Sequence, residues 1–276
     1  MTTRRRQDGT AMIAAMLVAA LAAGAAAVMV ERQDFAIRRL EAGRDYEQAR
    51  WVLKGGTQWA RSILAEDARS SNIDHPGEVW ATGLPATQIE QGTVAGEISD
   101  QQALFNLRNL TQEGKPSPQQ VAVLRRLLAI LGLPATLAEA IAAQPVGELG
   151  DLYRVRGVDE ATVSRLRAFV AVLPQPTPVN VNTAPPEVLA AIAGIDLTQA
   201  RTLARARSTT PFRDRDEFRA RLPQSGARPG DNDIAVQSRY FLVAGRATVG
   251  KADVRMEALL ERAAGALPAI VWQRIA

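Results

Sequence analysis

The sequence of 276 residues contains no cysteine, which excludes disulfides, thiolate metal sites and cysteine nucleophiles. It has a single histidine, His75, in a polar stretch, and no second imidazole exists to complete a metal site or a proton relay. We therefore expect His75 to lie in a loop. The sequence also offers no Ser-His-Asp set, no metal-ligand cluster, no phosphate-binding glycine loop and no carboxylate pair suited to catalysis. We predict that the protein is not an enzyme.

An excess of positive charge is nearly absent once the N-terminus is set aside. The formal net charge is +4, and residues 4–8 contribute +2 of it, so the rest of the chain carries only +2. Lysine is scarce, and the basic residues are mostly arginine. A sequence pI of about 9.9 is therefore a weak indication of a nucleic-acid partner.

Charged residues are also missing from one long stretch near the start of the chain. From Thr10 to Val30 no residue is charged, and a helix of 21 residues covers roughly 31 Å, the thickness of the hydrocarbon core of a bilayer. The arginines in front of it predict a cytoplasmic N-terminus and an exported body. A cleaved secretory signal is the alternative, because the alanines at 25–27 could supply a cleavage site.

No proline occurs in the first 75 residues, and the apolar run continues directly into an amphipathic one. One continuous helix is therefore expected from about Ala11 to about Asp67. Gly43 and the Gly55-Gly56 pair are expected to bend or fray it. The apolar face of its second half is formed by Ala42, Tyr46, Ala49, Leu53, Trp59 and Ile63.

The basic leader, the glycine directly before the apolar run and the half-amphipathic helix resemble the type IV prepilin-like class. In that class a prepilin peptidase cuts after the glycine, so the resemblance implies cleavage between Gly9 and Thr10 and N-methylation of Thr10. Most members carry glutamate at the fifth mature position, where this chain has Ala14. Among the pseudopilins of type II secretion, the K-type minor subunit lacks that glutamate.

Two further runs resemble the K-type minor pseudopilin family more specifically. Residues 92–110 read GTVAGEISDQQALFNLRNL, and residues 180–189 read NVNTAPPEVL. We expect structural roles for these side chains, with Thr183 capping a helix over 187–193 whose first turn holds the two prolines. The family-motif residues are Gly92, Gly96, Asp100, Gln102, Phe105, Asn106, Leu107, Asn109, Leu110, Asn180, Asn182, Thr183, Pro185 and Pro186.

Helical periodicity dominates residues 117–207, and two segments within this range resemble each other. Gly157 aligns with Gly194, and Asp159 aligns with Asp196, at a period of 37 residues. Each segment predicts a helix, a glycine turn and a second helix capped by the aspartate. Such helix-hairpin-helix units also occur in membrane-anchored DNA-uptake proteins, which is the main alternative function. The aspartates would place a carboxylate where a DNA phosphate binds, so we favour structural hairpins and expect no nucleic acid.

Strand patterns lie on both sides of this helical block. Residues 92–100 alternate between apolar and polar and predict a strand, and the alternation over 102–110 predicts a second one. Residues 238–262 predict a hairpin with its turn near Gly250, and residues 267–275 predict an edge strand. The segment 68–90 between the long helix and the first strand is expected to be a connection.

These elements predict an α+β fold. A long N-terminal helix, first transmembrane and then amphipathic, packs on a small antiparallel sheet, and an all-α domain with helix-hairpin-helix-like units is inserted. The expected divisions are a leader over 1–9, a transmembrane half over 10–30, an amphipathic periplasmic half over 31–67, an α/β pseudopilin domain over 68–111 and 221–276, and the inserted domain over 112–220.

The resemblance also raises the question of calcium. K-type members carry an acid-rich, calcium-binding segment in the inserted domain, and the corresponding stretch here keeps only Glu148 and Asp151. Calcium requires six to eight oxygen ligands, so this stretch supplies too few carboxylates. Asp231 and Asp233 are weak calcium candidates, and we expect no cofactor otherwise.

The resemblance implies a minor pseudopilin of type II secretion, held in the bacterial inner membrane by a single span with its body in the periplasm. It would cap the tip of the pseudopilus and help to start its assembly for the export of folded proteins across the outer membrane. The implied partners are the I-type and J-type minor pseudopilins, the rest of the pseudopilus, the assembly platform in the inner membrane and the prepilin peptidase.

Overall fold

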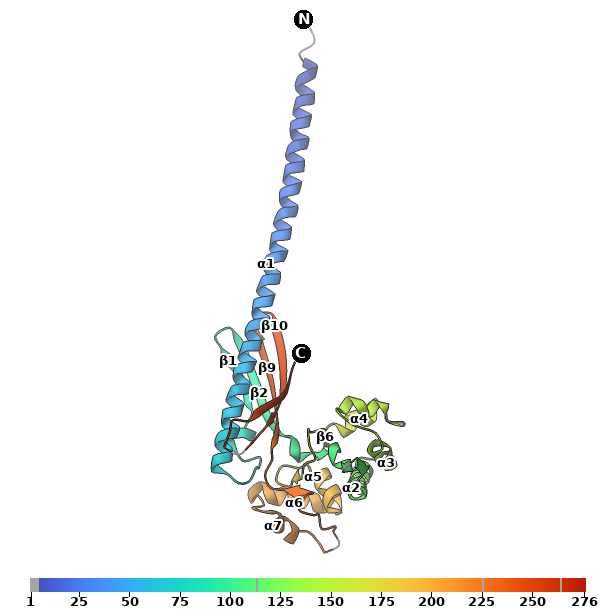
Figure 1. Cartoon of the computed structure of the whole chain (residues 1–276). Helices are drawn as coiled ribbons and strands as arrows, with labels where there is room; N and C mark the ends of the chain where they lie inside the picture. Colours follow the sequence, from blue (N-terminus) through green and yellow to red (C-terminus); the bar gives the residue numbers. More distant parts are fainter. Residues whose placement is uncertain (1–4, 113, 225, 264) are drawn as a thin grey trace.

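A single helix, α1, runs from Arg5 to Ser70 and projects far beyond the rest of the molecule (Figure 1). The computed structural model describes residues 5–112, 114–224, 226–263 and 265–276. At 1.5 Å per residue α1 is roughly 100 Å long. It is unbroken, so the prediction of one continuous helix is confirmed, while the fraying expected at Gly43 and at Gly55-Gly56 is wrong because helical backbone continues through all three glycines.

The two halves of α1 differ in their surroundings. Residues 10–44 are exposed on all sides, and the apolar part is long enough to cross a membrane. From Asp45 onward one face packs on a sheet, and Leu53 and Leu64 are almost fully buried there. Burial of each of these side chains stabilises the contact by about 1.5 to 3 kcal/mol.

The sheet has five antiparallel strands in the order β1-β2-β9-β10-β11. The predicted strand at 92–100, the hairpin and the C-terminal edge strand are confirmed, and the hairpin turns at Gly250. The segment 68–90 is expected to be a connection, but it contains a strand, β1, and the short 3-10 helix η1, Val79–Ala81. The strands are β1 Leu84–Ile89, β2 Gly92–Asp100, β9 Tyr240–Val249, β10 Ala252–Glu261 and β11 Ala269–Ile275.

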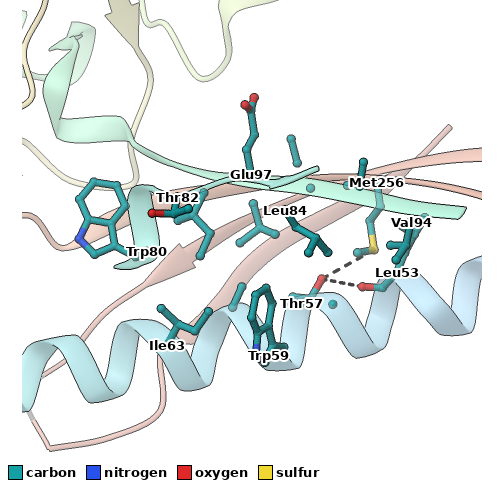
Figure 2. A pocket seen from close by; sticks show the side chains of 18 residues that line it. Leu53, Thr57, Trp59, Ile63, Trp80, Thr82, Leu84, Val94, Glu97 and Met256 are labelled. Atoms are coloured by element: carbon teal, nitrogen blue, oxygen red, sulfur yellow. Dashed lines mark hydrogen bonds between the residues drawn. The ribbon is translucent and has the colours of Figure 1, made fainter. Parts of the chain in front are cut away.

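Between α1 and the sheet lies a narrow apolar cleft of about 50 Å³ (Figure 2). Trp59 and Ile63 line it from the helix, and Leu84 and Val94 line it from the strands. Thr57, which is buried beside it, donates its hydroxyl to the carbonyl oxygen of Leu53 at 3.2 Å, so this polar group has a partner within the helix.

The chain between β2 and β9 forms a helical lobe at the end of the sheet away from the N-terminus (Figure 1). Its apolar core runs from Phe105 to Ile234 and is continuous. Phe212 and Phe218 are fully buried and meet edge to face, with ring centroids 5.2 Å apart. The helices of the lobe are α2 Pro118–Ile130, α3 Leu137–Ala142, η4 Leu149–Arg154, α4 Glu160–Leu166, α5 Pro186–Ala193, α6 Leu197–Thr209 and α7 Arg215–Ala220. Its two-residue strands are β3 Phe105–Asn106, β4 Thr111–Gln112, β5 Lys115–Pro116, β6 Val170–Ala171, β7 Val179–Asn180 and β8 Ile234–Ala235.

The two similar segments in the lobe have matching turns. Gly157 and Gly194 both adopt positive φ, at 89° and 60°. Asp159 accepts a hydrogen bond from the backbone N–H of Thr162, and Asp196 caps α6 in the same way. The first segment begins with the 3-10 helix η4 rather than an α-helix, so the two units differ on their N-terminal side.

The strand predicted over 102–110 is wrong. This segment forms the 3-10 helix η2 Gln101–Ala103, the two-residue strand β3 and the 3-10 helix η3 Leu107–Leu110. The cause is local, because the Asp100 and Asn106 side chains accept hydrogen bonds from backbone N–H groups two residues further on. Such side-chain caps compete with a strand ladder for the same donors.

Candidate functional site: the exposed helix and a buried polar junction

The exposed half of α1 contains the predicted processing site. Gly9 and Thr10 lie within the helix, and residues 1–4 of the predicted leader are outside the described residues. Ala14 is exposed, as are all the residues around it. Ala14, which cleavage after Gly9 would make the fifth residue of the mature chain, therefore presents a methyl group and no carboxylate.

The two glycines of the first motif run allow β2 to lie close to β9. A Cβ on Gly92 would lie 1.7 Å from the carbonyl oxygen of Thr248, and a Cβ on Gly96 would lie 3.1 Å from that of Ala244. No side chain fits at the first distance. The glycine that begins this motif run is therefore required by the pairing of β2 with β9.

Asp100, at the end of β2, joins the sheet to the lobe. Its Oδ2 accepts hydrogen bonds from Thr183 Oγ1 at 2.5 Å, Ser238 Oγ at 2.6 Å and Asn180 Nδ2 at 3.0 Å. Its Oδ1 accepts from the backbone N–H of Gln102 at 2.8 Å. Burial raises the pKa of Asp100 to about 6, with a further raising effect from Asp74, against the lowering effect of the hydrogen bonds from Ser238, Thr183 and the Gln102 backbone.

Other residues of the first run fasten the lobe. Asn106 donates to the carbonyl oxygen of Gln175 at 2.7 Å, and Asn109 makes two hydrogen bonds with the backbone of Thr177, at 2.8 and 2.9 Å. Gln102 donates to the carbonyl oxygen of Pro178 at 3.1 Å. All three side chains are buried, so these hydrogen bonds satisfy groups that water cannot reach. The apolar motif residues Phe105, Leu107 and Leu110 lie in the core of the lobe.

The second run is held in the same manner. The Asn182 side chain bonds both backbone groups of Phe212, at 2.8 and 2.9 Å. Thr183 does not cap the following helix as predicted, because its hydroxyl is directed to Asp100 and to the carbonyl oxygen of Asn180. Helix α5 instead begins with Pro185 at the N-cap and Pro186 in the first turn.

Arg207 supports this run from α6 by donating to the carbonyl oxygens of Val181 and Ala184. Burial lowers the pKa of Arg207 to about 10, so it stays charged at neutral pH. Sequence patterns did not indicate this role, because the charge lies within an arginine-rich helix whose other basic residues are largely exposed.

A second buried cation, Arg262, lies where the end of α1, the loop after α1 and the segment before β9 meet. This region, formed by Asp67, Asp74, Asp100, Asn180, Ser238 and Arg262, is called the junction below. Arg262 lies just after β10, and its Nη1 pairs with Asp67 at 2.8 Å while its Nη2 pairs with Asp74 and bonds the carbonyl oxygen of Ser238 at 2.7 Å. Burial raises the pKa of Asp67 to about 7 and raises that of Asp74, against the lowering effect of Arg262. Sequence reasoning missed this group, since 195 residues separate Arg262 from Asp67.

The residues predicted as remnants of a calcium segment do not fit that ion. Asp151 accepts hydrogen bonds from two backbone N–H groups and pairs with Arg154, and Glu148 pairs with Arg274. The two weaker candidates are also engaged with donors. Asp233 accepts from three N–H groups at 2.6 Å each, and Asp231 pairs with Arg219. Their carboxylates face nitrogen donors rather than a shared cation position.

The features that raised DNA binding argue against it in the structure. Asp159 and Asp196 cap their helices, so their carboxylates occupy the backbone N–H groups that would approach a phosphate.

His75 lies in a turn, where its Nδ1 accepts a hydrogen bond from the backbone N–H of Gly77 at 3.1 Å. The buried hydrogen bonds from Asn180 to Asp74 and Asp100 join the α1–sheet body to the lobe.

Comparisons with known proteins agree with the motif runs. A family model described as type II secretion system (T2SS), protein K, matches residues 179–237. Type II secretion system protein K of Pseudomonas aeruginosa is 32% identical over 299 residues, which cover 94% of this chain and 90% of that protein. The Klebsiella pneumoniae protein of the same name is 27% identical, covering 93% of each chain. The fold matches a chain of the GspK-GspI-GspJ complex from enterotoxigenic Escherichia coli with a TM-score of 0.72 and 22% identity, over 86% of this chain and 99% of that chain.

Proposed function

This chain belongs to the type II secretion system protein K family, and on that premise we propose that it caps the tip of the periplasmic pseudopilus and helps to start its assembly. It is a minor pseudopilin of the type II secretion system. Its action in this proposal is mechanical, since it occupies a position in a helical assembly that pushes folded proteins toward the outer membrane.

The observation that carries the proposal is the placement of the helical lobe. The exposed part of α1 leaves one end of the sheet, and the lobe covers the other end (Figure 1). If the subunit packs on the rest of the pseudopilus through α1, the lobe lies on the side away from the membrane. There it would block the addition of a further subunit. Gold-labelled chain should be found at one end of isolated pseudopili, and labelling along the shaft would contradict the cap.

The exposed half of α1 supports a proposal for the membrane topology. We propose that residues 10–30 span the inner membrane with the arginines on the cytoplasmic side. Prepilin peptidase would remove residues 1–9, and Thr10 would become the N-methylated terminus. Mass spectrometry of protein from a strain with the peptidase should find a chain that starts at Thr10. A chain that starts at Val28 or retains Met1 would contradict this processing.

The proposed partners are the I-type and J-type minor pseudopilins. Support comes from the fold match to a chain of the GspK-GspI-GspJ complex. Ala14 supports a place ahead of the other subunits, because it provides no carboxylate for the terminal amine of a neighbour. Co-purification of the chain with the I and J subunits from the same genome should yield a stable 1:1:1 complex. Recovery of the chain alone under conditions in which I and J bind each other would contradict the partnership.

A further inference from the structure

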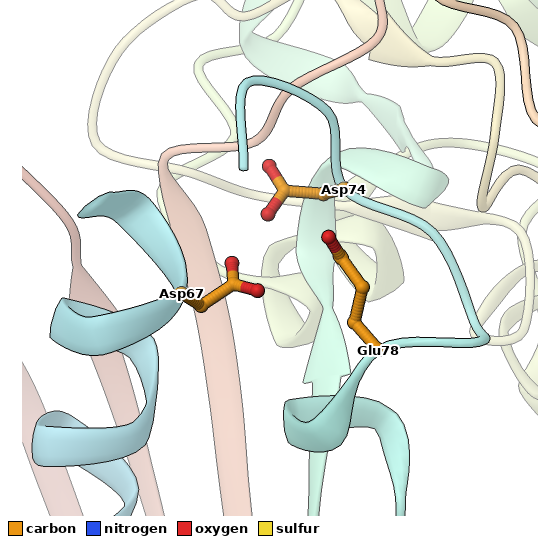
Figure 3. Close-up of side chains that lie close together, drawn as sticks. All are labelled: Asp67, Asp74 and Glu78. Carbon is orange, nitrogen blue, oxygen red and sulfur yellow. The ribbon is translucent and has the colours of Figure 1, made fainter. Parts of the chain in front are cut away.

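Three acidic side chains converge where α1 ends and the chain turns toward the sheet (Figure 3). Asp67 lies in the last turn of α1, Asp74 lies in the following loop, and Glu78 directly precedes η1. One side-chain oxygen from each lies within 4.8 Å of those from the other two. This cluster lies outside the 139–151 stretch in which the family resemblance places calcium.

The charges of this cluster are not balanced by the protein. Arg262 pairs with Oδ2 of Asp67 and Oδ2 of Asp74 and is itself almost fully buried. With all three carboxylates ionised, the cluster and one guanidinium would carry a formal charge of −2 in a region where Asp74 is only 1% exposed, and burial and mutual repulsion raise the pKa of Asp67 and Asp74 accordingly. His75 lies on the other side of Glu78, at 4.0 Å. Its Nδ1 already accepts a hydrogen bond, so the proton of a neutral ring is on Nε2, which faces Glu78 and cannot then bind a metal.

The Asp74 carboxylate gives a second, independent indication. Its Oδ2 accepts from Arg262 and from the backbone N–H of Ser238, whereas its Oδ1 is buried and has no hydrogen-bond partner among the described residues. In Figure 3 one oxygen of this carboxylate is on the side that faces the Asp67 and Glu78 carboxylates. A buried carboxylate oxygen without a partner destabilises the fold, so a ligand at this position would remove a free-energy cost.

We propose that Asp67, Asp74 and Glu78 bind one divalent cation, and that this cation is calcium. The ligand atoms are all oxygens, and one divalent ion cancels the formal charge of −2. Calcium accepts irregular arrangements of carboxylate oxygens at roughly 2.3 to 2.6 Å, whereas magnesium demands a near-ideal octahedron at roughly 2.0 to 2.1 Å. Water would supply the remaining ligands in this half-buried site.

The site is held open by surrounding hydrogen bonds. Oε2 of Glu78 accepts from the indole of Trp80 at 2.8 Å and from the backbone N–H of His75 at 2.9 Å, which fixes the carboxylate. The Asp74 backbone bonds Val236 at 2.8 Å and Asn180 at 3.1 Å. A bound ion would therefore tie the end of α1 to the loop before η1, whose Asp74 backbone is hydrogen-bonded to Asn180 and Val236 of the lobe. This role is independent of a position at the pseudopilus tip.

Trp80 allows a direct test, because its indole touches a proposed ligand and can transfer excitation energy to a bound lanthanide. The full-length protein in detergent, stripped with a chelator, is titrated with Tb³⁺ at pH 7.5. We expect tryptophan-sensitised emission that saturates with one ion per chain, that calcium displaces and that equal magnesium leaves in place. Calcium should also raise the melting temperature. The absence of saturable emission and of a calcium-dependent shift would overturn the proposal and would mean that protons alone neutralise the cluster.

Three variants locate the ion. Glu78→Gln keeps an acceptor for Trp80 and should weaken Tb³⁺ binding at least tenfold. Trp80→Phe should abolish the sensitised emission while the shift of the melting temperature by calcium remains. Asp231→Asn, at an exposed carboxylate paired with Arg219, is the matched control. It should change neither Tb³⁺ binding nor the shift of the melting temperature by calcium. Equal binding by Glu78→Gln and the wild type would place the ion elsewhere and overturn the assignment.

Discussion

Asn180 donates its side-chain N–H to the Asp100 carboxylate at 3.0 Å, and this hydrogen bond joins the two motif runs across 80 residues of sequence. Both side chains are buried, Asn180 completely. The same Asn180 nitrogen lies 3.1 Å from the carbonyl oxygen of Asp74 and 3.0 Å from Ser238 Oγ. One amide group therefore holds the end of β2, the loop after α1 and the chain that enters β9.

Replacement of that amide by a carboxylate should be strongly destabilising. Asn180→Asp is nearly isosteric, but it places a second carboxylate beside Asp100 in a buried site, and we expect a loss of about 3 to 5 kcal/mol at neutral pH. The exchange Asp100→Asn with Asn180→Asp restores one charge and one amide and should recover more than half of the loss. Urea unfolding of both variants measures this, and an exchange no more stable than Asn180→Asp would contradict a specific pairing.

The pKa of Asp100 predicts a pH dependence with a definite sign. Burial raises this pKa from 3.8 to about 6, so the folded protein holds the proton more tightly than the unfolded chain. The stabilisation is fully present below pH 3.8 and is lost as the pH rises to about 6. At about 1.4 kcal/mol per unit, the loss is about 3 kcal/mol.

The measurement compares the free energy of unfolding of the wild type with that of Asp100→Asn at several pH values, since Asp74 and Arg262 contribute to both proteins. The stability of the wild type relative to the variant should fall between pH 4 and pH 6 and then stay level. A relative stability that rises with pH would show that the four hydrogen bonds to the carboxylate outweigh its burial.

How far the sequence predicts this structure depends on the range of each interaction. The long helix and the C-terminal hairpin follow from local periodicity and were predicted correctly. The strand predicted over 102–110 is wrong because the Asp100 and Asn106 side chains accept hydrogen bonds from backbone N–H groups two residues further on, which the alternation of apolar residues does not reveal. The Arg262 centre has no local pattern at all, because its partners come from the end of α1 and the loop after it.

Loss of the buried cation should cost more than loss of an exposed one. Arg262→Met removes the guanidinium from Asp67 and Asp74 and should destabilise the protein by about 3 to 5 kcal/mol in the presence of a chelator. The control is Arg246→Met, which breaks an exposed pair with Asp253 and should cost less than about 1 kcal/mol. Thermal or urea unfolding distinguishes the two, and equal small losses would mean that Arg262 is not the charge that stabilises the junction.

Two glycines that look alike in the sequence should respond in opposite directions to alanine. A Cβ on Gly92 would meet the carbonyl oxygen of Thr248 at 1.7 Å, so Gly92→Ala must separate β2 from β9 and should cost about 2 to 4 kcal/mol. Gly55 lies in the sheet-packed half of α1 with nothing within 4 Å of a Cβ, so Gly55→Ala should stabilise the helix by about 0.5 to 1 kcal/mol. Urea midpoints of the two variants should move to opposite sides of the wild type, and a shift in the same direction would contradict the close approach of β2 to β9 at Gly92.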